Sequence, residues 1–103
     1  MPRNELVTAS DTTMRILDLV GFCDRYGTYA EGQWTFYMDE VNQDNALDAS
    51  ARLFTAILLT SFPEYQCNTA GDDLARLVKP IETTFGPFDP HAIHAAMDAV
   101  IHG

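Results

Sequence analysis

The chain has 103 residues, of which 47% are hydrophobic, and a formal net charge of −9 at pH 7. This length suits one domain with one hydrophobic core, and the apolar content excludes an intrinsically disordered chain. Direct binding to a phosphate backbone requires a basic stripe, and six Lys and Arg residues against fifteen Asp and Glu residues do not supply one.

No segment has the features of a membrane span or a secretory signal. The longest apolar run, residues 53–62, is half the length that a membrane-spanning helix needs. Polar residues rather than an apolar stretch follow the N-terminus. We therefore expect one cytoplasmic domain over residues 1–103 that makes no membrane contact and has a flexible N-terminal segment over residues 1–9.

The first predicted helix begins near Ser10 or Asp11 and continues to Tyr26. Ile16, Leu19, Val20 and Cys23 recur along it at steps of three and four residues, which is the spacing of a helix with one apolar face. Gly27 is expected to end it.

The segment over residues 29–42 fits two structures. Thr28, followed three residues later by an acid, resembles a helix N-cap, and Trp34, Met38 and Val41 would then share a buried face. Trp34, Phe36 and Met38 also alternate with other residues, which is typical of a strand. A helix is the first prediction and a strand is the alternative.

Three further helices follow, each after a capping residue: Asn45, Thr69 and Asp89. The first, residues 46–62, is apolar on nearly every side and is expected at the centre of the core. The second begins at Ala70 and is expected to kink or end at Pro80. The third runs from Pro90 to Ile101. The predicted fold is all-α, a compact bundle of about five short helices around the helix over residues 46–62.

The sharpest metal-site candidate lies on the last helix. His91, His94, Asp98 and His102 follow one another at steps of three, four and four residues, so they share one face and could chelate zinc or nickel. The same pattern fits the solvated side of an amphipathic helix. We therefore predict neither a metal nor another cofactor and keep these four residues as a weak candidate.

No catalytic motif is present, and we expect no enzymatic activity. The sequence lacks a Gly-x-Ser-x-Gly elbow, a Walker loop, a dinucleotide glycine fingerprint and a His-Glu-x-x-His pair. Cys23 and Cys67 are far apart in the chain and form no Cys-x-x-Cys motif, so both are interpreted as buried thiols.

Aromatic residues are followed directly by acidic residues in the middle of the chain. If residues 29–42 form a helix that buries Trp34, Tyr29 and Phe36 lie seven residues apart on its opposite face. Exposed aromatics beside carboxylates are typical of protein-binding hot spots. The predicted partner-binding residues are Tyr29, Phe36, Asp39, Glu40, Asp44 and Asp48. The alternative is that this helix is buried on both faces.

From these residues we predict a small acidic protein-binding module that docks onto a basic partner protein, as a monomer or a homodimer. In its sharpest form the module inhibits a nucleic-acid-handling protein by presenting carboxylates in place of phosphates, as phage-encoded inhibitors or immunity proteins could. One alternative is a self-associating structural subunit, and another is a metal- or ligand-binding helical domain. The acidic surface could also serve solubility alone.

Overall fold

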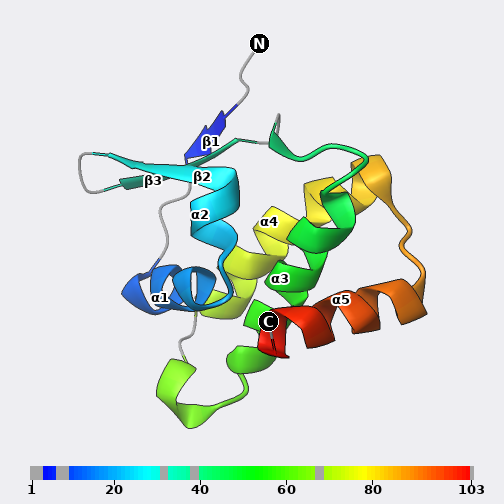
Figure 1. The fold of residues 1–103 in the computed structure, drawn as a ribbon. Helices are drawn as coiled ribbons and strands as arrows, with labels where there is room; N and C mark the ends of the chain where they lie inside the picture. The colour runs from blue at the N-terminus through cyan, green and yellow to red at the C-terminus, as the bar shows by residue number, and fades with distance from the viewer. Residues whose placement is uncertain (1–3, 7–9, 31–32, 38–39, 67–68, 103) are drawn as a thin grey trace.

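The computed structural model of the chain describes residues 4–6, 10–30, 33–37, 40–66 and 69–102. Helices make up most of the described chain, which confirms the predicted helical bundle (Figure 1). In chain order the elements are β1 (Asn4–Leu6), α1 (Asp11–Leu19), α2 (Phe22–Tyr26), β2 (Gly27–Ala30), β3 (Gln33–Tyr37), α3 (Ala46–Leu59), the 3-10 helix η2 (Pro63–Tyr65), α4 (Ala70–Phe85) and α5 (Pro90–His102).

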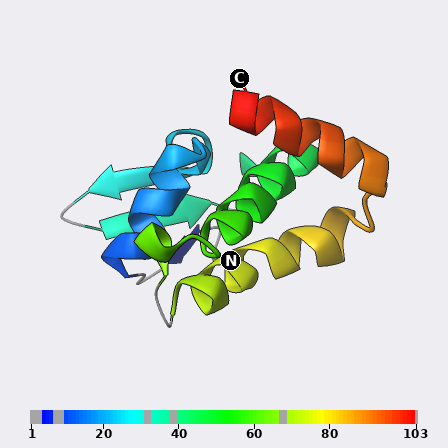
Figure 2. The same ribbon diagram turned by 90° about the horizontal axis from the view of Figure 1, so that it is seen from below.

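Helix α3 is the central helix, as its sequence predicts. It lies between α4 on one side and α5 on the other (Figure 2), and it packs against both of them. Ala49, Leu53 and Ala56 on α3 are completely buried. The helix ends at Leu59, before the predicted end at Phe62.

The first predicted helix is divided into two. Helix α1 starts as expected, because the Ser10 side chain accepts a hydrogen bond from the Thr13 amide at 3.1 Å. Gly21 then takes a left-handed conformation with φ of 74°, which ends the helix as glycine commonly does after a last turn. The chain resumes as α2, which ends at Tyr26 just before Gly27.

The prediction of a helix over residues 29–42 is wrong, and the alternative prediction of a strand is confirmed. Strand β3 is the centre of a three-stranded antiparallel sheet, with β1 on one side and β2 on the other. Strand β1 comes from the segment predicted to be flexible, and it pairs Asn4 with Tyr37 and Leu6 with Thr35. Because this pairing joins residues far apart in the chain, local sequence spacing did not reveal it.

Helix α4 continues through Pro80 to Phe85, although the sequence predicts a kink or an end at this proline. Proline has no amide hydrogen, so the carbonyl of Arg76 loses its usual donor one turn later. The buried residues Leu77, Val78 and Ile81 hold this part of the helix on the core. Packing therefore outweighs the local cost of the proline.

Candidate protein-binding surfaces

Phe36 is a core residue, which corrects the prediction that it lies on an exposed surface. Its relative exposure is 4%, and its ring centre lies 5.4 Å from that of Phe22. Gly27 opposite it in the sheet leaves the necessary space, because a Cβ at Gly27 would come within 2.9 Å of the Phe36 ring. A strand turns Phe36 toward the helices, whereas the predicted helix would have turned it outward.

Glu40 and Asp44 are exposed, in the loop that leads into α3. Two asparagines order this loop. The Asn42 side chain accepts a hydrogen bond from the Asp44 amide at 2.8 Å, and the Asn45 side chain donates to the Glu40 carbonyl at 2.7 Å. The structure therefore presents both carboxylates from a fixed loop. Asp39 and the side chain of Tyr29 lie outside the described residues.

Asp48 joins three parts of the fold. Its carboxylate accepts a hydrogen bond from the Tyr26 hydroxyl at 2.7 Å and another from Arg52 Nε at 3.0 Å. Arg52 also donates to the carbonyl of Val20 at 2.8 Å. Burial acts to raise the pKa of Asp48, but the bonds from Arg52 and Tyr26 outweigh it, so the pKa lies below its usual value. Burial and the bond to Asp48 raise the pKa of Tyr26.

We expect Asp48→Asn to destabilise the fold by about 1 kcal/mol near neutral pH, because the substitution breaks a partly exposed ion pair and hydrogen bond. A carboxyl whose pKa is lower in the folded state stabilises the fold at neutral pH and loses this effect as protons bind. The difference from the wild type should therefore shrink as the pH falls below about 4. Urea unfolding at neutral and acid pH measures it.

The exposed residue Asp44 supplies the control for this prediction. Asp44→Asn removes the same charge without breaking an ion pair, and we expect its stability to follow the wild type at both pH values. A cost of Asp48→Asn that stays constant down to acid pH would contradict the role assigned to the ionised Asp48 carboxylate.

Three arginines of the described residues, Arg15, Arg25 and Arg52, donate to backbone carbonyl groups. Arg15 donates to the Glu64 carbonyl at 3.1 Å and lies over the Tyr65 ring, and Arg25 donates to the Gly21 carbonyl at 3.3 Å. Within the described residues, ion pairs form only between Arg52 and Asp48 and between Arg76 and Asp73. Many acidic side chains of the described ranges are therefore exposed and form no ion pair. They are Asp11, Asp18, Asp24, Glu40, Asp44, Glu64, Asp72, Glu82, Asp89 and Asp98.

The weak metal candidate lies on the exposed side of α5. His91, His94, Asp98 and His102 are all exposed there. In the part of the chain that the structure describes, no three His, Cys, Asp or Glu side chains are arranged to hold a metal ion.

Cys23 is a buried, free thiol. Burial and the nearby carboxylates of Asp18 and Asp24 raise its pKa to about 12. The thiolate is the nucleophilic form of cysteine, so this environment does not activate Cys23 for catalysis. Cys67 lies outside the described residues.

Four large apolar side chains are exposed, which the sequence pattern did not predict. Leu19 on α1, Leu58 on α3, Phe62 just after α3 and Ile101 on α5 are each more than half exposed. The apolar character of residues 46–62 was visible in the sequence, but it predicted complete burial rather than this exposed end.

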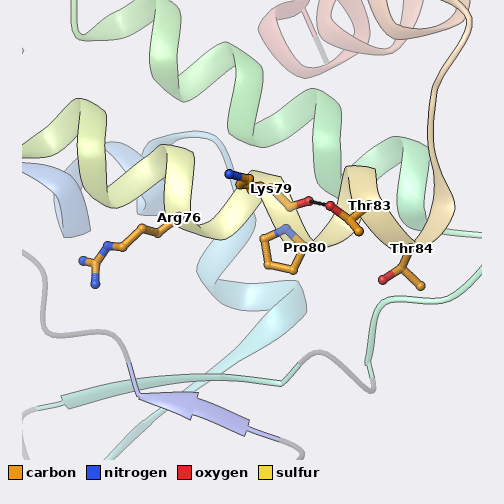
Figure 3. Close-up of a pocket in the computed structure, with 5 residues that line it drawn as sticks. All are labelled: Arg76, Lys79, Pro80, Thr83 and Thr84. Atoms are coloured by element: carbon orange, nitrogen blue, oxygen red, sulfur yellow. Dashed lines mark hydrogen bonds between the residues drawn. The ribbon is translucent and has the colours of Figure 1, made fainter.

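One side of α4 carries an open groove of about 440 Å³ (Figure 3). Arg76, Lys79, Pro80, Thr83 and Thr84 line it. Arg76 is bound to Asp73 at 2.7 Å, and the Thr83 hydroxyl donates to the Lys79 carbonyl at 2.9 Å. All these residues come from one helix, so the described residues do not enclose a ligand here.

Comparison of the chain with protein-family models, with curated proteins and with solved structures finds no match. None of the helices in the described ranges is long and apolar enough to span a membrane.

Proposed function

We propose that the chain is a small acidic protein-binding module that engages a basic partner protein. The observation that carries this proposal is the use of arginines for internal carbonyl groups. Within the described residues Arg15 and Arg25 form no ion pair, although Arg25 lies near enough to Asp48 to lower its pKa, and Arg52 and Arg76 each pair with one carboxylate. The remaining exposed carboxylates keep their negative charge, which attracts a basic surface over several ångströms.

Glu40 and Asp44 are the carboxylates best placed for direct contact. Both are exposed, and the loop that carries them is ordered by a hydrogen bond from the Asp44 amide to the Asn42 side chain and one from the Asn45 side chain to the Glu40 carbonyl. A partner therefore finds these charges already positioned, with little ordering entropy to lose on binding. Phe36 was predicted to belong to this surface, but its side chain is buried and takes no part in it.

The sharpest form of the proposal is an inhibitor in the cytoplasm that occupies the nucleic-acid groove of its partner. Carboxylates then take positions that phosphates would otherwise occupy. The molecule has principal extents of 39, 35 and 22 Å, and its exposed carboxylates without an ion pair lie on α1, α2, η2, α4, α5 and the loops before α3 and α5. This spread over a flattened body supports contact with an extended basic groove.

The test starts with capture of a partner from host lysate at low salt and measures its affinity for two double variants. Glu40→Gln with Asp44→Asn should weaken binding about twofold to thirtyfold, because each of the two exposed ion pairs contributes about 0.2 to 1 kcal/mol. Glu82→Gln with Asp98→Asn changes the net charge equally at other places and should weaken binding less. Higher salt should weaken binding of the wild type.

Three results can contradict the proposal. Binding that is equally strong at high salt would exclude an electrostatic contact. Equal affinities for the wild type and both double variants would exclude the exposed carboxylates. A partner that still binds its nucleic acid when saturated with this chain would exclude the inhibitor form.

A further inference from the structure

Helix α5 lies outside the core of the molecule. Its main packing partner is α3, and none of its own residues is buried. By contrast, α3 contains seven buried residues and α4 contains six. Figures 1 and 2 both show α5 on the outer side of α3. The core is therefore built without a fully buried side chain from α5.

The contact between α5 and α3 is apolar. The half-buried face of α5 consists of Ala92, Ile93, Ala96, Met97 and Val100, which recur at helical spacing. Among the residues of α5, Val100 is the one that packs against the hydrophobic core. In the described ranges no hydrogen bond or ion pair joins α5 to α3. Helix α5 can therefore leave α3 without breaking a hydrogen bond between the two helices.

Ala51 marks the part of α3 that α5 covers. Its relative exposure is 0%, as is that of Ala49 and Leu53 in the core. Ala51 lies about 160° around the helix from each of these two residues, because successive residues of an α-helix are about 100° apart. It therefore faces the side of α3 on which Figure 2 places α5. Removal of α5 would expose this side of α3.

The connection between α4 and α5 is anchored as far as Phe88. Phe85 and Phe88 are both partly buried and pack against the hydrophobic core. Asp89 and Pro90 follow directly and are exposed. A movement of α5 would therefore start at residues 89 and 90 and leave α4 in place.

We propose that α5 is a detachable cover of α3, which opens as one unit while the rest of the fold stays intact. Segments with few buried apolar contacts open more readily than the core does. A helix of 13 residues is marginal on its own in water. Helix α5 therefore unfolds when it leaves α3, and the chain entropy that it regains favours the open form. This opening does not involve Glu40 or Asp44, so it is independent of the proposed function.

Native-state hydrogen exchange of the full chain, followed by NMR, tests this proposal. Relative to their intrinsic rates, the amides of α5 should exchange at least about a hundredfold faster than the slowest amides of α3 and α4. They should still exchange more slowly than the amides of an unfolded peptide, and they should share one opening equilibrium. Low concentrations of urea should accelerate them less than the amides of α4, because opening of α5 exposes less surface than global unfolding.

Two matched valine substitutions distinguish local opening from global unfolding. Val100→Ala removes a contact that is lost in both events, so it should accelerate the amides of α5 and α4 by the same factor, about threefold to tenfold. Val78→Ala removes a buried contact of α4 that is lost only in global unfolding. It should accelerate the slowest amides of α3 and α4 and leave the rates of α5 unchanged.

Three results would overturn the proposal. Amides of α5 that exchange as slowly as the slowest amides of α3 and α4 would show that α5 unfolds only with the whole protein. Amides of α5 without any protection would show that it never covers α3. Equal acceleration of α5 and α4 in Val78→Ala would tie the opening of α5 to global unfolding. The first two results come from the wild type, so the test does not depend on whether Val78→Ala folds.

Discussion

Phe36→Ala is expected to destabilise the fold by about 3 to 5 kcal/mol, since it removes a large aromatic side chain from a close-packed core. The Phe36 ring lies 5.4 Å from the Phe22 ring, which in turn lies 5.0 Å from the Tyr26 ring. The substitution opens a cavity between the sheet and α2. For a domain of this size each kcal/mol lowers the melting temperature by about 4 to 8 °C. Thermal and urea unfolding measure the effect.

Phe62→Ala provides the matched control, because Phe62 is 51% exposed and the substitution removes the same atoms. We expect the free energy of unfolding of a monomeric sample to fall by less than about 1 kcal/mol. If Phe36→Ala left the melting temperature unchanged, Phe36 would be a surface residue as the helix prediction required, and the assignment of β3 would be wrong.

Pro80→Ala is expected to stabilise the protein by about 1 to 3 kcal/mol. Proline inside a helix costs about 3 kcal/mol relative to alanine. Alanine restores the hydrogen bond from residue 80 to the Arg76 carbonyl. The gain is reduced by the smaller entropy of an unfolded chain that contains proline, which is worth about 0.4 to 1 kcal/mol. Urea unfolding of both forms gives the difference.

Lys79→Ala is the control for this effect, because it changes the neighbouring exposed residue and keeps every backbone hydrogen bond of α4. Its free energy of unfolding should stay within about 0.5 kcal/mol of the wild type. A loss of stability in Pro80→Ala would show that the ring, which is partly buried, contributes more through packing than it costs the helix.

Local signals in the sequence located the three long helices, and the structure begins each one at the predicted residue. One predicted helix cap does not form the expected hydrogen bond between its side chain and the first turn of the helix. Asn45 precedes α3, but its side chain bonds to Asn42 and Glu40 rather than to the first turn of the helix. The position of the cap followed from residue type, whereas its bonding depends on the shape of the preceding loop.

The sheet and the site built on Phe36 could not be predicted in the same way. Trp34 and Phe36 lie on different faces at helical spacing and on one face at strand spacing, so the choice of period decides which side chain is buried. That choice depends on the pairing of β3 with Asn4–Leu6, about thirty residues away in the chain. The exposure of Leu58 likewise depends on how far α5 covers α3.

Lys79 is the single lysine of the chain and is exposed on α4. An amine-reactive dye therefore attaches to one internal position. Helix α4 lies on the opposite side of α3 from α5 (Figure 2), so α3 separates the dye from α5. Binding of a partner can then be followed in solution through the fluorescence anisotropy of this dye.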